Sequence, residues 1–186
     1  MSFSKPTKIL LLGGNIWYFA EGMLGPLFAV FADRIGGDIL DITWAWAIYL
    51  IFAGLLYVVV GKITDRYDNA EKIMVAGYIL NTICTFSFII VSAPWHLFLV
   101  QAGLGISAAL ASPTWNALYA KHGDDSQRGF QWGFAGGAAQ IITGIAVIIG
   151  GYIVNFGSFT TLFIIMGIIQ AIATIYQAQI LKNSPK

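Results

Sequence analysis

Long apolar runs alternate with short polar breaks along the chain, and this pattern predicts helices that cross a membrane. Each run is close to the roughly 20 residues that a helix needs to span the hydrocarbon core of a bilayer. Runs of this length favour helices over the shorter, alternating strands of a membrane barrel. The six runs cover about residues 9–32, 42–60, 71–91, 97–119, 129–154 and 159–181. We therefore predict an all-α membrane protein with six transmembrane helices.

Composition supports the same conclusion. The chain has 186 residues, of which 58% are hydrophobic and only 10% are charged. A soluble domain carries roughly 25% charged residues, so this chain cannot cover its surface with polar groups. The single cysteine, Cys84, lies within an apolar run and excludes an intrachain disulfide. We expect the chain to be embedded in membrane lipid.

The positive charges predict how the protein is oriented. Nine lysines and arginines fall on the side of the predicted termini, whereas Arg34 alone falls on the opposite side. The nine are Lys5, Lys8, Lys62, Arg66, Lys72, Lys121, Arg128, Lys182 and Lys186. Short loops rich in lysine and arginine remain cytoplasmic. This predicts a multi-pass protein of the cell (inner or plasma) membrane with both termini in the cytoplasm.

The chain contains a weak internal repeat. Residues 1–186 form one predicted domain, which divides into a first repeat at about residues 8–92 and a second at about 95–182. The offset that aligns Pro26 with Pro113 also aligns Phe28 with Trp115. Because each repeat holds three helices, an odd number, the two must be inverted. Proline-interrupted spans at matching positions of inverted halves are a sequence indicator of a transporter's binding site.

The polar break at residues 61–72 holds the most specific motif. Its sequence Gly61-Lys-Ile-Thr-Asp65-Arg66 resembles the Gly-x-x-x-Asp-Arg signature between the second and third helices of major facilitator superfamily (MFS) transporters. The resemblance covers the whole chain, but only one six-helix half of the usual twelve-helix protein. Further matching positions are Gly25-Pro26, Gly103, Gly105, Pro113, Arg128-Gly129 and Gly150-Gly151.

The chain departs from the family pattern at three places. Residues 67–70 replace the usual basic run, and Leu99 or a neighbour replaces an arginine of the fourth helix. The Gly-Pro pair that is associated with antiporters falls on Ala146-Val147. The loss of this pair favours uptake over antiport.

A lone half would expose its polar cavity to lipid, which is unfavourable. Two copies in the same orientation restore the arrangement of the family, so the resemblance implies a parallel, two-fold homodimer. A different partner half of similar size satisfies the same requirement, as does a longer chain.

Glu21 lies near the middle of the first apolar run. A charged acid there costs roughly 3 kcal/mol on insertion scales, and such residues usually face a cavity and serve ions or protons. In MFS transporters, acids of the first helix often couple proton movement to transport, so the resemblance implies a proton-coupling role. The alternative is a permanently protonated glutamate that is hydrogen-bonded to a neighbouring helix.

Helical spacing places Tyr18 on one stripe with Glu21, and Gln101 on one stripe with Trp115, with Asn116 beside them. In the family these two helices line the cavity. The resemblance therefore implies substrate contacts from Tyr18, Gln101, Trp115 and Asn116. The alternative is that each one simply bonds packed helices together.

Three further groups of residues receive expectations. Gln140, with Gly133, Gly137 and Gly144, predicts a closely packed helix face. By resemblance, Gly61, Asp65 and Arg66 form a gating motif, in which Asp65 meets a helix N-terminus and Arg66 pairs with a carboxylate; the alternative is a positive anchor. The tryptophans Trp17, Trp44, Trp46 and Trp132 are expected to include anchors at the membrane surface.

The sequence holds no enzyme motif, no phosphate loop, and no metal-binding spacing, since His96 and His122 are far apart. We expect no cofactor, no metal and no nucleic-acid partner. Three functions remain: a proton-coupled secondary transporter of a small molecule acting by alternating access, an assembly subunit that needs another partner, or a passive facilitator. Aromatic residues near the predicted cavity suit either sugars or amphipathic cations.

Overall fold

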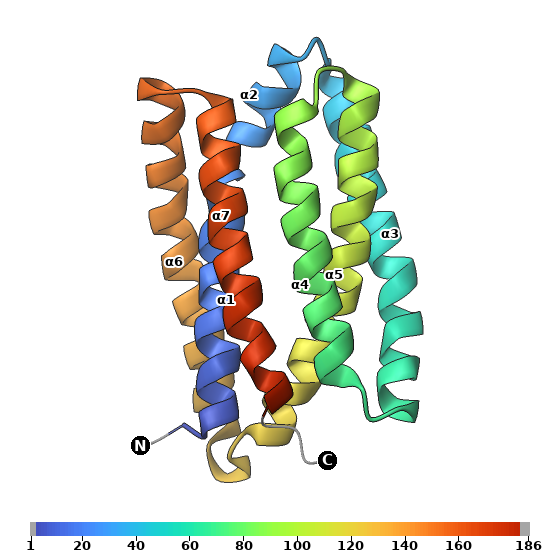
Figure 1. Cartoon of the computed structure of the whole chain (residues 1–186), viewed down its shortest axis with the longest axis vertical. Coiled ribbons are helices and arrows are strands. Elements are labelled where there is room, and N and C mark those ends of the chain that lie inside the picture. Colours follow the sequence, from blue (N-terminus) through green and yellow to red (C-terminus); the bar gives the residue numbers. More distant parts are fainter. Residues whose placement is uncertain (1–2, 183–186) are drawn as a thin grey trace.

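The computed structural model describes residues 3–182, and every regular element in that range is a helix (Figure 1). Three short 3-10 segments, at Phe88–Ile90, Asp125–Gln127 and Ala178–Lys182, accompany the longer helices. The α-helices are α1 (Lys5–Leu24), α2 (Leu27–Arg34), α3 (Ile39–Arg66), α4 (Ala70–Ser87), α5 (Pro94–His122), α6 (Arg128–Phe156) and α7 (Phe159–Gln177).

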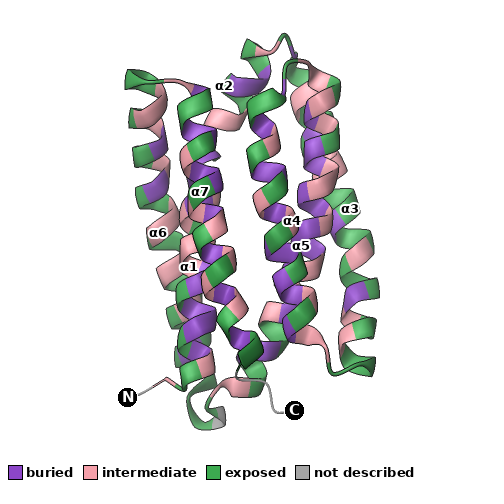
Figure 2. Ribbon diagram, in the orientation of Figure 1, coloured by how far each residue is buried: buried purple, intermediate pink, exposed green. Residues whose placement is uncertain are grey.

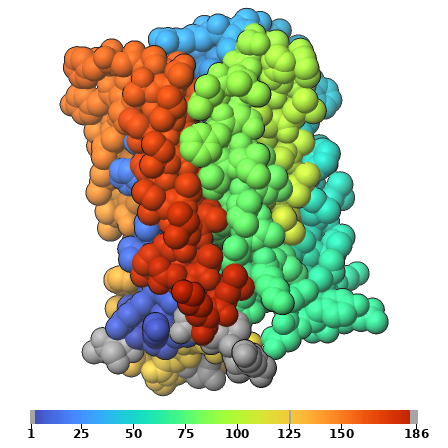
Figure 3. All heavy atoms as spheres, in the orientation of Figure 1, coloured from blue at the N-terminus to red at the C-terminus, as the bar shows by residue number. Residues whose placement is uncertain are grey.

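The helices pack as two groups that run side by side. One group consists of α1, α6 and α7, and the other consists of α3, α4 and α5. The groups meet where α4 packs along α7 and where α1 contacts α5. In Figure 1, α7 and α4 lie in front of α1 and α5, while α6 and α3 form the two outer edges. The space-filling view shows α7 and α4 in contact over most of this front face (Figure 3).

Five of the helical segments are long and apolar enough to cross a membrane, judged by length and composition among the described residues. They are Ile39–Arg66, Ala70–Ile90, Pro94–His122, Arg128–Phe156 and Phe159–Lys182. Helix α1, which ends at Leu24 and carries Lys8 and Glu21 within its apolar part, is not among them. This architecture fits a helical membrane fold.

The first predicted helix is not continuous. Helix α1 ends at Leu24 and α2 begins at Leu27, with Gly25 and Pro26 between them. Proline has no backbone N–H, so Pro26 cannot donate the hydrogen bond that would continue α1. The prediction of one helix over residues 9–32 was therefore wrong, since the chain breaks one turn after Glu21.

The polar break at residues 61–72 is shorter than the sequence suggested. Helix α3 continues to Arg66, and its last hydrogen bond runs from the Tyr67 N–H to the Ile63 carbonyl at 3.0 Å. Residues 67–69 alone separate α3 from α4. The prediction that this helix ends at residue 60 was wrong, because charged side chains at a helix end lie at the water boundary without interrupting the backbone.

Local signals fix the start of α3 after the turn that follows α2. Gly36 has φ of 82°, a left-handed conformation that glycine adopts without steric penalty. Asp38 then forms a capping box: its Oδ1 accepts from the N–H groups of Leu40 and Asp41 at 2.8 and 2.9 Å. These bonds satisfy donors that have no partner within the helix.

Burial differs strongly between helices (Figure 2). In the most apolar stretch of α5, 56% of the residues are buried, whereas only 11% of the residues are buried in the corresponding stretches of α3 and α6. One core cluster centres on Phe31, Phe88 and Phe163, whose rings contact one another at 4.8 to 6.0 Å. The two outer helices therefore hold apolar faces that this chain does not cover.

The basic residues gather at one end of the bundle. The starts of α1, α4 and α6 and the ends of α3 and α5 all lie at the end where both termini are drawn (Figure 1). These helix ends carry seven of the predicted cations, and Lys182 ends the 3-10 segment that follows α7, while Arg34 ends α2 at the opposite end. Lys186, one of the nine, lies outside the described residues.

Candidate functional site

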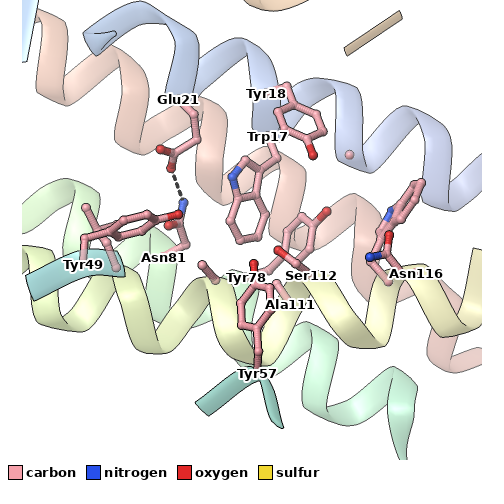
Figure 4. A pocket seen from close by; sticks show the side chains of 14 residues that line it. Trp17, Tyr18, Glu21, Tyr49, Tyr57, Tyr78, Asn81, Ala111, Ser112 and Asn116 are labelled. Atoms are coloured by element: carbon pink, nitrogen blue, oxygen red, sulfur yellow. Dashed lines mark hydrogen bonds between the residues drawn. The ribbon is translucent and has the colours of Figure 1, made fainter. Parts of the chain in front are cut away.

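A cavity of about 490 Å³ lies between four helices and is bordered by Glu21 (Figure 4). Helices α1 and α5 supply most of its wall, and α3 and α4 supply tyrosines and an asparagine. The lining residues are Gly14, Trp17, Tyr18, Glu21, Tyr49, Tyr57, Tyr78, Asn81, Leu104, Ala108, Ala111, Ser112, Trp115 and Asn116. We call this space the first cavity.

A second cavity of about 270 Å³ adjoins the first. The two share Tyr18, Glu21, Tyr49 and Leu104, so Glu21 borders both. The remaining lining residues of the second cavity are Gly22, Leu24, Gly25, Phe28, Trp46, Thr85, Phe88, Gln101, Thr143 and Met166. The break after Leu24 thus lies beside this cavity.

Two side-chain amides hold Glu21. Asn81 Nδ2 of α4 donates to Glu21 Oε1 at 2.8 Å, and Gln170 Nε2 of α7 donates to the same oxygen at 3.1 Å. Asn81 Oδ1 in turn accepts from the Ser107 hydroxyl of α5 at 3.3 Å, and that hydroxyl also donates to the Gly77 carbonyl at 2.9 Å. Side chains from three other helices, α4, α5 and α7, therefore hold the carboxyl group of Glu21 directly or through Asn81.

Glu21 has no basic neighbour. Across the described residues, the linings of both cavities include no lysine, arginine or histidine. Lys121 does form an ion pair, with Asp68 at 3.6 Å, but this pair lies at the end of the bundle and not beside Glu21. The carboxyl group is thus surrounded by amides, hydroxyls and rings.

Aromatic rings form much of the wall around Glu21. The Trp17 and Tyr78 rings meet edge to face with centroids 4.2 Å apart, and Trp46 stacks on Tyr49 at 5.4 Å. Trp115 stacks on Tyr119 at 4.7 Å, and its Nε1 donates to the Leu10 carbonyl at 3.0 Å. The rings are therefore held by packing and by hydrogen bonds to the backbone.

Comparison with known proteins establishes the family. The sequence profile described as "Major Facilitator Superfamily" matches residues 10–185. The chain belongs to the Major Facilitator Superfamily. Members of this family are multi-pass membrane transporters of small molecules, so the chain is a membrane protein of a transporter family.

Individual relatives are distant. The chain is 20% identical to the "Uncharacterized MFS-type transporter YitZ" of Bacillus subtilis (strain 168) over 139 residues, which cover 75% of this chain and 84% of YitZ. It is 27% identical to the "Quinolone resistance protein NorB" of Staphylococcus aureus (strain bovine RF122 / ET3-1) over 161 residues, or 86% of this chain. That match covers 34% of NorB, so the chain spans about a third of the NorB length.

The structure brings the predicted site residues of this MFS chain together. Tyr18, Trp115 and Asn116 line the first cavity, and Gln101 is buried and lines the second. Glu21 lies between them. The indole N–H of Trp115 is already used to join α5 to α1, so this residue also serves the packing role that the sequence left open. Whether these residues contact a substrate stays a prediction.

The gating motif lies apart from the cavities, in the last turns of α3. The guanidinium carbon of Arg66 lies 5.6 Å from the centroid of the Tyr67 ring. No ion pair of Arg66 with a carboxylate is present among the described residues, and the predicted pairing stays a prediction. The roles of Gly61, Asp65 and Arg66 in gating stay predictions.

The prediction that the helix face around Gln140 is closely packed was wrong within this chain. Gln140 is exposed, and a Cβ placed on Gly133, Gly137 or Gly144 would meet nothing within 4 Å among the described residues. This face of α6 points away from the other helices of the chain, because α1 covers a different side of α6.

Sequence reasoning missed several residues around Glu21. Tyr49 and Tyr57 lie eight positions apart on α3 and therefore share a helix face, a signal that was present in the sequence. Trp17 was expected among membrane-surface anchors, but it packs on Tyr78 inside the first cavity. The partners Asn81 and Gln170 were visible only as isolated amides within apolar runs.

Proposed function

We propose that this chain forms one half of a secondary active transporter. Two copies in parallel orientation enclose the cavities and move a small molecule by alternating access, coupled to protons through Glu21. The observation that carries this proposal is the pair of adjoining cavities that share the carboxyl group of Glu21, which is hydrogen-bonded by two amides. Tyr18 is 50% exposed and Asn116 is exposed, so the first cavity opens at the surface of the chain, where a second copy would close it.

The packing of the helices supports two inverted three-helix repeats and a sixth crossing made by α1 with α2. Exchanging α1 with α5, α3 with α6 and α4 with α7 converts each principal helix contact into another principal contact or leaves it unchanged. The α1–α6 contact becomes α5–α3, the α1–α7 contact becomes α5–α4, and α4–α7 maps onto itself. Pseudo-symmetry of this kind is usual in transporters that are built from inverted repeats.

The uncovered faces of α3 and α6 support a second copy. A Cβ placed on Gly54 or Gly61 of α3, or on Gly137 or Gly144 of α6, would meet nothing within 4 Å in the described structure. Small residues on a helix face allow close approach of another helix in a membrane.

The charge distribution supports a cytoplasmic location for the end that holds both termini, in a plasma or inner membrane. At this end lie Gly61, Asp65 and Arg66, which we assign to gating. In this role they stabilise one of the two access states, and Arg66 exchanges its contact with the Tyr67 ring for a carboxylate in the other state.

The surroundings of Glu21 support proton coupling. A carboxylate without a positive partner is poorly tolerated away from water, so a proton or a ligand must compensate its charge. Asn81 and Gln170 donate to its Oε1, which keeps the ionised form accessible. The group is therefore suited to release and regain a proton during each cycle.

Reconstitution tests this function. The purified chain is placed in liposomes that contain the pH-sensitive dye pyranine, and maltose, lactose, tetraphenylphosphonium and ethidium are added one at a time under an imposed pH gradient. We expect at least one of these solutes to move and to change the internal pH. The Glu21→Gln variant should lose solute-driven proton movement while it retains downhill solute exchange.

The alternatives give different results. Solute movement that ignores the pH gradient identifies a passive facilitator. If none of the solutes moves although the protein is folded and inserted, the chain is an assembly subunit and the transporter assignment is withdrawn. Full proton-driven accumulation by Glu21→Gln removes the coupling role from Glu21.

A further inference from the structure

We propose that the second cavity binds a small, neutral aromatic ligand that carries a carboxamide group, and that the side chain of Gln101 pairs with this group. Three observations carry the proposal: a buried amide without a hydrogen-bond partner, an acid without a basic partner beside it, and an apolar wall around both. The site lies within one chain, whereas its place in a transport cycle rests on the proposed function.

Gln101 is a buried amide that borders the second cavity from α5. The residue is 3% exposed, and neither its Nε2 nor its Oε1 makes a hydrogen bond in the described structure. A buried polar group without a partner is unfavourable, and nearly all such groups in proteins are paired. The partner of Gln101 therefore comes from the cavity, either as water or as a ligand.

The other buried amides of the chain differ from Gln101 in this respect. Five asparagines and glutamines are buried among the described residues. Four of them, Asn81, Gln131, Gln170 and Gln177, each make at least one hydrogen bond to another group of the chain. These four join helices or loops to one another. Gln101 makes no such connection, so its polar atoms remain available to a molecule in the cavity.

The chemistry of a side-chain amide restricts the groups that satisfy it. Its carbonyl oxygen accepts and its N–H group donates, and the two functions lie side by side in one plane. A ligand carboxamide presents the same two functions in the opposite order. Two parallel hydrogen bonds then satisfy both amides at once. A ketone accepts from the Gln101 N–H group but leaves the Gln101 carbonyl oxygen without a donor.

The charges around the cavity favour a neutral ligand over an anion. Glu21 borders the second cavity, and no lysine, arginine or histidine lines it in the described part of the chain. A carboxylate ligand would place a second negative charge near Glu21 without a positive partner, which is unfavourable away from water. A carboxamide has the shape of a carboxylate without its charge.

The buried part of the wall is apolar apart from Gln101 and Thr85. Leu24, Phe88 and Met166 line the cavity and are all buried. The Thr85 hydroxyl is already used, since it donates to a backbone carbonyl of α4 at 2.9 Å. An aromatic ring packs well against such side chains, with Phe88 as a partner ring. The ring of the ligand is therefore placed among these apolar side chains when its amide pairs with Gln101.

Further polar groups lie at the more exposed part of the wall. Tyr18 and Tyr49 border both cavities, Trp46 is 53% exposed, and Thr143 is half-buried. These hydroxyls and the indole N–H also suit the hydroxyls of a sugar, so the test includes one. The cavity of about 270 Å³ is below the roughly 300–1,000 Å³ of sites for drug-sized ligands, so the ligand or its amide-bearing end is small.

Ligand-observed NMR titrations of the full chain in detergent test the proposal without requiring transport. Four probes share one shape: benzamide, acetophenone, which has no N–H donor, benzoate, an anion, and benzamidine, a cation. We expect saturable binding of benzamide. Acetophenone and benzoate should bind about tenfold more weakly, because each leaves one polar function of Gln101 without a partner. Benzamidine should bind no more tightly than benzamide.

Variants provide the matched comparison. Gln101→Leu should weaken benzamide binding about tenfold and bring benzamide and acetophenone to the same affinity. This variant removes an unpaired buried amide, so its thermal unfolding midpoint should be no lower than that of the unmodified chain. Gln177→Leu removes another buried amide, on α7 outside both linings, and should keep the preference for benzamide.

Equal benzamide affinity of Gln101→Leu and the unmodified chain overturns the proposal, because water alone then satisfies Gln101. Tighter binding of benzamidine than of benzamide overturns the neutral carboxamide as the ligand class, as does saturable maltose binding that Gln101→Leu abolishes. Gln101-dependent benzamide binding without movement of any solute in liposomes supports this site and removes only the transporter assignment. Solute movement without Gln101-dependent benzamide binding overturns this site and leaves the transporter assignment in place.

Discussion

Gln170 Nε2 lies 3.1 Å from Glu21 Oε1, although 149 positions separate the two residues in the sequence. Gln170 belongs to α7, on the front face of the bundle, and reaches inward to a carboxyl group that borders both cavities. Its own Oε1 is buried and has no hydrogen-bond partner in the described structure. An unpaired buried acceptor is unfavourable, so this amide is held in place by its bond to Glu21.

Replacing Gln170 with leucine should change the pH dependence of the site. The substitution removes one of two donors to Glu21 Oε1, and hydrogen bonds to charged groups contribute about 1.5–3 kcal/mol. The ionised carboxylate is then disfavoured and forms only at higher pH. We expect the pH midpoint of solute-driven proton movement in liposomes to move up by about one pH unit.

Gln177→Leu is the matched control for this experiment. Gln177 lies two turns further along α7, is equally buried, and also has an unpaired Oε1, but its Nε2 bonds to Met74 Sδ. This variant should keep the original midpoint. Equal midpoints for Gln170→Leu and the unmodified chain would show that the Gln170–Glu21 bond does not tune the site.

Trp115→Phe separates packing from ligand contact. The variant keeps a ring that can stack on Tyr119, but it loses the N–H that donates to the Leu10 carbonyl. We expect the free energy of unfolding to fall by about 1 kcal/mol, with less than a threefold change in the rate of solute movement in liposomes. A large loss of solute movement at unchanged stability would instead assign Trp115 chiefly to ligand contact.

Gly150 and its neighbour Gly151 should respond in opposite ways to alanine. A Cβ at Gly150 would collide with the Met23 carbonyl oxygen, where α6 crosses α1, whereas a Cβ at Gly151 would meet nothing within 4 Å in the described structure. We expect Gly150→Ala to destabilise the bundle by about 1–3 kcal/mol. Gly151→Ala should be neutral or slightly stabilising, because alanine favours helix. Thermal unfolding in detergent measures both.

The edge positions of α3 and α6 predict how two copies meet. A two-fold axis along the membrane normal beside the cavities places α3 of one copy against α6 of the other. Gly54 lies twelve residues before the end of α3 and Gln140 twelve residues after the start of α6, so they sit at the same height.

Co-expressed chains carrying Gly54→Cys or Gln140→Cys, each with Cys84→Ala, should form a disulfide-linked dimer on mild oxidation. In the control, chains carrying Gly54→Cys are co-expressed with chains carrying Ile168→Cys, on the exposed face of α7, and this pair should not cross-link. Equal cross-linking by both pairs, or none by either, would contradict the parallel arrangement.

The sequence located five long helices that are apolar enough to cross a membrane, because an apolar run of about 20 residues matches the thickness of the hydrocarbon core. It also identified Glu21 as exceptional, since an acid within such a run is unfavourable wherever the helices pack. The motif around Asp65 and Arg66 indicated the family that the profile match then established.

Only the tertiary structure decided which residues surround Glu21. Hydrophobic periodicity reports that a helix has a buried side, but in a membrane chain both sides are apolar, so it does not specify the neighbour. Gln170 and Asn81 became partners of one oxygen through the approach of α7 and α4 to α1. The break at Pro26 was visible in the sequence, but its consequence, a second cavity beside Glu21, depended on how α1 and α3 pack around it.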